Sequence, residues 1–140
     1  MTKAKYAGCI LARPSFARCG AAAVSILTEP DRFDGSLEDL AAGSRSLAPL
    51  GVPAMRKDFL ADPYQVLEAR AHGASGVLLI VRMVPRARLV EMLDCAAEHG
   101  LFVLLEAFDA EDLEVAGEIA RERESRDEQV LMGLNCRDLQ

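Results

Sequence analysis

Three polar side chains close short apolar runs of the sequence, and two of them, a lysine and a glutamate, are suited to acid–base chemistry. Lys57, Glu106 and Asn135 each end such a run. Continuous apolar runs of this length are typical of buried parallel strands, and the carboxyl ends of parallel strands face the ligand in α/β proteins. A lysine ammonium and a glutamate carboxylate across a partly desolvated site can donate and accept a proton. The sequence therefore predicts an acid–base site at these strand ends.

Arg137 follows the last of these runs, where its guanidinium could hold a carboxylate through two parallel hydrogen bonds. Two other interpretations stay open on the residues alone. Lys57 could be a solvated loop residue, and the charged side chains could form a structural ring of ion pairs at the strand ends.

Glycines mark the elements that must position these residues. Gly20, Gly51, Gly73 and Gly100 each stand before an apolar run, as expected where a helix ends and a strand follows. The spacing is about that of one βα unit, which predicts an α/β fold with a parallel sheet. The expected elements are an opening helix at 10–19 and strands at 22–28, 52–57, 76–82, 101–106 and 130–135.

Side chains at helical spacing, all of them apolar except Arg70, fill the segments between the strands. These stripes are Leu37, Leu40 and Ala41; Val66, Leu67 and Arg70; Leu89, Met92, Leu93 and Ala96; and Leu113, Ala116 and Ile119. Asp62 and Pro63 suit an N-cap and a first helical position. His72 and His99 precede glycines and are predicted to be helix C-terminal caps rather than catalysts. The charged stretch 121–128 is interpreted as the solvated end of a helix with its loop.

Composition narrows the class of protein. Of 140 residues, 51% are hydrophobic but only 5% are aromatic, which predicts one domain over 1–140 with an aliphatic core. A net charge of −6 argues against nucleic-acid and membrane partners. No apolar run approaches the roughly 18 residues of a membrane span, and no signal-peptide core is present, so we expect a cytoplasmic protein. Cys9, Cys19, Cys95 and Cys136 are expected to be reduced thiols, with disulfides or metal binding as the less favoured alternatives.

Several motifs resemble the indole-3-glycerol phosphate synthase family of tryptophan biosynthesis. The matching segments are 25–29, 33–37, 55–59, 62–70, 76–80, 104–106 and 133–139. They run in order through almost the whole chain, and R-K-D-F followed by N-x-R-D-L is a specific combination. The resemblance implies a partial TIM (β/α)8 barrel in which the five predicted strands are strands two to six.

The resemblance also implies a reaction. The family closes the ring of 1-(2-carboxyphenylamino)-1-deoxyribulose 5-phosphate, with loss of carbon dioxide and water, and it uses no metal or organic cofactor. By the family pattern, Lys57 protonates or polarises the sugar carbonyl, Glu106 is the general base, and Asn135 orients the reacting atoms. Arg137 would hold the substrate carboxylate. The walls around the anthranilate ring would be Phe33, Phe59 and Leu78.

The chain departs from the family pattern at both ends. The E-x-K-x-x-S-P-S strand that opens the family's barrel is not found, residues 1–9 are unmatched, and no segment matches strands seven and eight. We therefore expect a fragment with little activity of its own. It would be either a lyase completed by self-association or a complementing barrel fragment, or a non-catalytic remnant of the family. A phosphoribosyl isomerase barrel fits R-K-D-F and N-x-R-D-L poorly.

Overall fold

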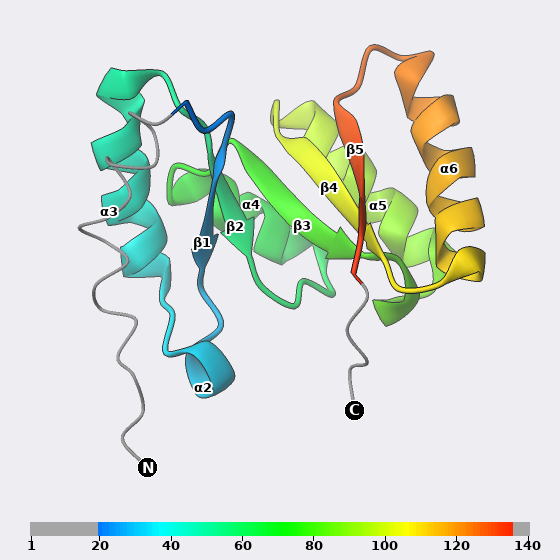
Figure 1. The fold of residues 1–140 in the computed structure, drawn as a ribbon, viewed down its shortest axis with the longest axis horizontal. Helices are drawn as coiled ribbons and strands as arrows, with labels where there is room; N and C mark the ends of the chain where they lie inside the picture. Colours follow the sequence, from blue (N-terminus) through cyan, green and yellow to red (C-terminus); the bar gives the residue numbers. More distant parts are fainter. Residues whose placement is uncertain (1–19, 136–140) are drawn as a thin grey trace.

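The computed structural model describes residues 20–135, in which strands and helices alternate (Figure 1). The opening helix expected at 10–19 lies outside these residues, as do Cys9, Cys19 and Cys136. The strands are β1 (Val24–Leu27), β2 (Ala54–Lys57), β3 (Gly76–Ile80), β4 (Phe102–Ala107) and β5 (Val130–Leu134). The helices are α2 (Pro30–Phe33), α3 (Leu37–Leu47), α4 (Pro63–Ala71), α5 (Arg86–Glu98) and α6 (Ala110–Glu124), with short 3-10 turns η2 (Ala48–Leu50) and η3 (Val81–Met83).

The five strands form one sheet in the order β1-β2-β3-β4-β5, and every neighbouring pair is parallel. Figure 1 shows the sheet curving across the molecule, with α4 and α5 behind it and α3 and α6 at its flanks. Because each strand is joined to the next through a helix, all carboxyl ends lie at one edge. The parallel α/β arrangement predicted from the glycine repeat is confirmed.

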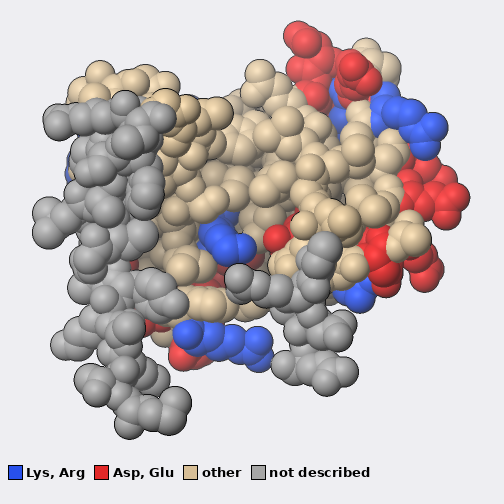
Figure 2. Space-filling view, in the orientation of Figure 1, with Lys and Arg blue, Asp and Glu red and all other residues tan. Residues whose placement is uncertain are grey.

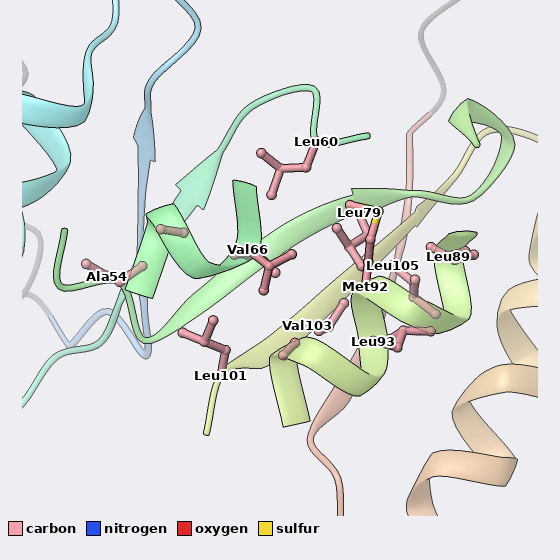
Figure 3. Packing of buried hydrophobic residues seen from close by; sticks show 14 of the residues in the cluster. Ala54, Leu60, Val66, Leu79, Leu89, Met92, Leu93, Leu101, Val103 and Leu105 are labelled. Carbon is pink, nitrogen blue, oxygen red and sulfur yellow. The ribbon is translucent and has the colours of Figure 1, made fainter. Parts of the chain in front are cut away.

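The hydrophobic core lies between the helices and one face of the sheet. Leu79, Val103 and Leu105 project from β3 and β4 into this layer and are at most 1% exposed. Figure 3 shows them packed with Leu89 and Met92 of α5. Alternate residues of each strand therefore serve the core, and the residues between them face the other side of the sheet.

The second face of the sheet contains one close contact between neighbouring strands. Gly76 lies beside Phe102 in the register, and a Cβ at Gly76 would come within 2.4 Å of the Phe102 ring. The glycine thus makes room for an aromatic ring on this face. Ile80 pairs with Glu106 further along the same two strands, which places Leu78, Ile80 and Glu106 together on the second face, toward the carboxyl end.

Local signals set the helix ends as predicted. Asp62 caps α4 in a reciprocal capping box with Gln65. His72 and His99 occupy the C-caps of α4 and α5, and the glycines that follow them have φ of 86° and 65°. Positive φ is the conformation that glycine adopts without strain, so the interpretation of both histidines as caps is confirmed.

Two details of the sequence prediction differ from the structure. Strand bounds shift by at most two residues at any end, for example where residues after Ile80 turn into η3 instead of extending β3. Leu67 and Leu113, assigned to buried stripes, are 41% and 36% exposed. On α4 the inward pair is Val66 and Ala69, both fully buried, because so short a helix presents only a narrow face to the sheet.

The charged stretch 121–128 is not wholly solvated, contrary to the sequence interpretation. Arg123 is 1% exposed, and its guanidinium donates to Asp94 at 2.5 Å and to Glu128 at 3.0 Å. These bonds tie α6 to α5 and to the loop before β5. A buried charge survives there because two carboxylates neutralise it. Among residues 20–135, no helix combines the length and apolarity needed to cross a membrane.

Candidate functional site

A cavity of about 160 Å³ lies at the carboxyl ends of the strands. All six predicted site residues that the structure describes line it: Lys57, Glu106, Asn135, Phe33, Phe59 and Leu78. The seventh, Arg137, lies outside the described residues. A larger hollow of about 560 Å³ lies at the opposite end of the sheet, near the loop before β5, and contains none of these side chains. The spacing of the sequence motifs therefore identified one connected pocket.

Lys57 reaches this pocket from the last position of β2 and is half-buried. Its neighbour Arg56 points away from the pocket, toward α4. Arg56 is 4% exposed and donates to Asp58 and to Glu68, at 2.9 Å and 2.8 Å. Strand alternation explains this arrangement, since Arg56 lies on the helix-facing side of β2 and Lys57 on the other. Lys57 is thus not a solvated loop residue.

One aromatic wall of the pocket comes from the segments after β1 and β2. The rings of Phe33 and Phe59 lie 6.5 Å apart at an interplanar angle of 36°. Phe33 ends α2, whose first turn is capped by the Glu29 carboxylate, which accepts from the Asp31 and Arg32 backbone N–H groups at 3.1 Å and 2.7 Å. The two rings together offer an apolar surface of the kind that binds an aromatic ring.

Phe108, which the sequence analysis missed, also lines the cavity. Its backbone N–H donates to Asp112 at 2.9 Å, and the Arg82 guanidinium lies 5.4 Å from its ring centroid. Phe108 could have been found by strand alternation, because it follows Glu106 by two residues and so shares its face. Leu27 and Ile80 line the cavity as well.

An ion-pair cluster fixes the loop that carries Phe108. Arg82 donates to Asp109 and to Asp112, the latter at 2.7 Å. These bonds, first to Asp112 and then to Asp109, raise the pKa of Arg82 above its ordinary value. The backbone N–H of Asp112, followed by the Arg82 guanidinium, lowers the pKa of Asp109 below its ordinary value. The cluster connects the turn after β3 to the start of α6.

The polar groups of the pocket are few and of both signs. Lys57 supplies an ammonium, Asn135 supplies an amide, and Glu29, Asp58 and Glu106 supply carboxylates. Asn135 is placed by its backbone N–H, which donates to the carbonyl of Ala107 at 2.8 Å. The arrangement offers a proton donor and a proton acceptor beside apolar walls.

The electrostatic surroundings separate this site from the bulk of the negative charge. Figure 2 shows acidic side chains gathered over α6, whereas the face of the sheet turned to the viewer is mostly uncharged. Within residues 20–135, no group of three or more His, Cys, Asp or Glu side chains is arranged to hold a metal ion.

Comparison with solved structures agrees with the fold. Phosphoribosyl anthranilate isomerase from Thermotoga maritima superposes with a TM-score of 0.57 at 20% identity, over 89% of this chain and 57% of the isomerase. A phosphoribosyl anthranilate isomerase in complex with reduced 1-(o-carboxyphenylamino)-1-deoxyribulose 5-phosphate gives 0.56 at 20% identity, over 88% and 59%. At this identity the likeness shows the fold alone, which is a partial TIM barrel as predicted.

Comparison of sequences reaches further. An indole-3-glycerol phosphate synthase from Leifsonia xyli is 45% identical over 120 residues, and one from Dehalococcoides mccartyi is 43% identical over 124. The matches cover 86% and 89% of this chain but only 42% and 45% of those relatives. The chain thus spans less than half the length of the curated relatives it matches. The family model for indole-3-glycerol phosphate synthase matches residues 5–140, and we conclude that the chain belongs to the indole-3-glycerol phosphate synthase family.

Proposed function

We propose that this chain carries part of the site that converts 1-(2-carboxyphenylamino)-1-deoxyribulose 5-phosphate to indole-3-glycerol phosphate, a carbon–carbon lyase reaction of tryptophan biosynthesis. One observation carries the proposal. The family's acid, base and amide positions and three of its wall positions all line one cavity, although they come from separate strand ends. A chance set of strand-end charges would not be accompanied by a matching set of aromatic and aliphatic walls.

In the proposed mechanism, the anthranilate ring lies between the aromatic walls, and its carboxylate is held by Arg137. The Lys57 ammonium donates a proton to the sugar ketone oxygen as the ring carbon bonds to the carbonyl carbon. Carbon dioxide then leaves from that ring carbon, and its electron pair restores the ring. The Lys57 amine regains a proton from solvent and gives it to the new hydroxyl, which departs as water. Glu106 accepts the proton lost from the neighbouring methylene carbon, and Asn135 orients the departing hydroxyl. The overall loss is one carbon dioxide and one water.

The proposal is best tested by binding. Because cooperating catalytic groups act as a unit, a site observed in part is a poor subject for turnover measurements. The reduced substrate analogue 1-(o-carboxyphenylamino)-1-deoxyribulose 5-phosphate, which is bound in the isomerase structure, carries a fluorescent anthranilate group. The chain contains no Trp, so the emission of the analogue can be followed without interference from the protein.

We expect saturable binding that Lys57→Ala weakens by about tenfold, the effect of losing roughly 1.4 kcal/mol of a charge-assisted contact. The matched control is Arg86→Ala, which removes an exposed cation of α5 that pairs with Glu118 of α6, outside the pocket. Arg86→Ala should bind as the unchanged chain does. Equal affinity of the Lys57→Ala and unchanged chains would contradict the proposed role and favour a non-catalytic member of the family.

A further inference from the structure

We propose that Arg56, Thr28 and Asp58 form a positioning network that sets the direction of the Lys57 side chain. The inference rests on the proposed function only in giving that direction a catalytic purpose. Arg56 and Thr28 do not line the cavity, and Asp58, which borders it, has no substrate contact in the proposed mechanism. Their effect on the reaction would pass entirely through Lys57 and the neighbouring Phe59.

The network joins the ends of β1 and β2 to α4. The Arg56 guanidinium uses all three nitrogens: Nε donates to Thr28 Oγ1 at 3.0 Å, and the other two donate to Asp58 at 2.9 Å and to Glu68 at 2.8 Å. A further bond at 2.9 Å reaches the Gln65 carbonyl. A guanidinium that is 4% exposed would be costly if any nitrogen were left without an acceptor. Burial therefore favours the one orientation of the guanidinium in which every nitrogen has an acceptor.

Thr28 is the junction of the network. Its hydroxyl accepts from Arg56 and donates to Asp58 at 2.5 Å, and its side chain is buried with the residue 4% exposed. The other oxygen of Asp58 accepts from the backbone N–H of Phe59 at 2.8 Å. The backbone is therefore held on both sides of Lys57, at Arg56 and at Asp58, and the same carboxylate places the ring of Phe59.

Lys57 depends on this backbone control because its own side chain has no other restraint. Within residues 20–135, its ammonium makes no ion pair or hydrogen bond. A flexible four-carbon stem without a partner takes its direction from the backbone and the walls around it. If the end of β2 shifted, the Lys57 ammonium would move within the pocket although no hydrogen bond of its own would break.

A purely structural role for the network predicts a different result. In that case, mutating the network would lower the free energy of unfolding but leave the environment of Lys57 unchanged in the folded protein. The lysine content makes this distinction measurable, since the chain has three lysines, Lys3, Lys5 and Lys57. Reductive methylation with 13C-formaldehyde labels each one, and the Lys57→Arg variant identifies the Lys57 signal by its absence.

The sharpest variants differ by one hydroxyl at the junction. Thr28→Val keeps the side-chain shape but removes the Oγ1 atom, and Thr28→Ser keeps the hydroxyl. We expect the Lys57 methyl signal, displaced by the nearby rings in the unchanged chain, to move to the position of free dimethyl-lysine in Thr28→Val. Thr28→Ser should restore it. Analogue affinity should fall by about tenfold in Thr28→Val, the scale expected of a misplaced group.

A matched control lies at the other end of the sheet. Arg123 is, like Arg56, a buried arginine between two carboxylates. We compare Arg56→Met with Arg123→Met at equal folded fraction, measured by far-ultraviolet circular dichroism. Both should unfold at lower urea, but only Arg56→Met should move the Lys57 signal. If Thr28→Val and Arg56→Met are folded and leave that signal unchanged, the positioning role is overturned.

The two proposals fail separately in this design. If the unchanged chain does not bind the analogue, the proposed function fails, while the Lys57 signal still decides the positioning role. If the analogue binds but the signal is the same in Thr28→Val, Thr28→Ser and the unchanged chain, the positioning role fails and the proposed function stands.

Discussion

The loop between β1 and α3 should tolerate no side chain at Gly35. A Cβ built there lies 2.6 Å from the carbonyl oxygen of Leu27 and 2.9 Å from the backbone nitrogen of Thr28. Both are backbone atoms of the strand end, so they cannot rotate aside as a side chain would. Gly35 also donates its N–H to the Glu29 carbonyl at 2.9 Å, which closes the short loop that presents Phe33 to the pocket.

The magnitude follows from the displacement that Gly35→Ala requires. Ordinary van der Waals contact begins at 3.4 Å, so the loop must retreat by about 0.8 Å from the 2.6 Å position of the built Cβ. A shift of that size weakens the Gly35 hydrogen bond and strains the packing, at a cost of about 2 kcal/mol by comparison with other overpacked sites. It also moves Phe33 away from Phe59, so analogue binding should weaken by roughly tenfold.

Urea unfolding followed by circular dichroism measures the stability change, and analogue fluorescence measures binding. Gly117→Ala is the matched control, since it is the same chemical change inside α6, where a Cβ would meet nothing within 4 Å. That variant should be stabilised by about 0.5–1 kcal/mol, because alanine loses less conformational entropy than glycine in a helix. If Gly35→Ala were as stable as the unchanged chain, the close approach of the loop to Leu27 would be wrong.

Three further predictions concern the framework of the fold. Gly76→Ala should destabilise the sheet by about 2 kcal/mol in urea unfolding, because its Cβ would meet the Phe102 ring, and adding Phe102→Leu should recover part of the loss. Asp109→Asn should reduce the fall in urea midpoint between pH 7 and pH 3. The lowered pKa of Asp109 gives stability that is present above its unfolded pKa, near 4, and is lost as the pH falls through the lower folded value. Arg82→Met should weaken the same pH response without abolishing it, because the backbone N–H of Asp112, the larger cause of the lowered pKa, remains. Arg123→Met should cost on the order of 2 kcal/mol, the scale of hydrogen bonds to charged groups, and a neutral result would show that its ion pairs do not stabilise the fold.

The sequence was sufficient for the fold because its signals were local and repeated. Caps such as Asp62 and the glycines after His72 and His99 fix where helices begin and end. Between them, uninterrupted apolar runs leave a parallel strand as the consistent assignment. Periodicity could not predict which face of a helix turns toward the core. Leu67 is exposed because the inward positions of α4 are taken by its neighbours.

The site was predicted less completely than the fold. The described residues that resemble the family motif line one cavity, but the partners that hold them were not foreseen. Arg56 and Asp58 read in sequence as two more charges beside Lys57, and nothing in their spacing shows which side of the strand becomes buried. Arg123 was missed for the same reason, since burial of a charge depends on carboxylates far away in sequence.

The restraints on the pocket all join neighbouring elements. Thr28 to Asp58 connects β1 with β2, the Ile80–Glu106 register connects β3 with β4, and the backbone N–H of Asn135 donates to a residue of β4. Among the described residues, no restraint on the cavity needs β1 to touch β5. The geometry of this part of the site is therefore set by contacts between adjacent strands, each of which can form as soon as its two strands pair. A ligand that contacts only these strand ends would find its subsite already shaped, which is why binding of the analogue is the decisive measurement for this chain.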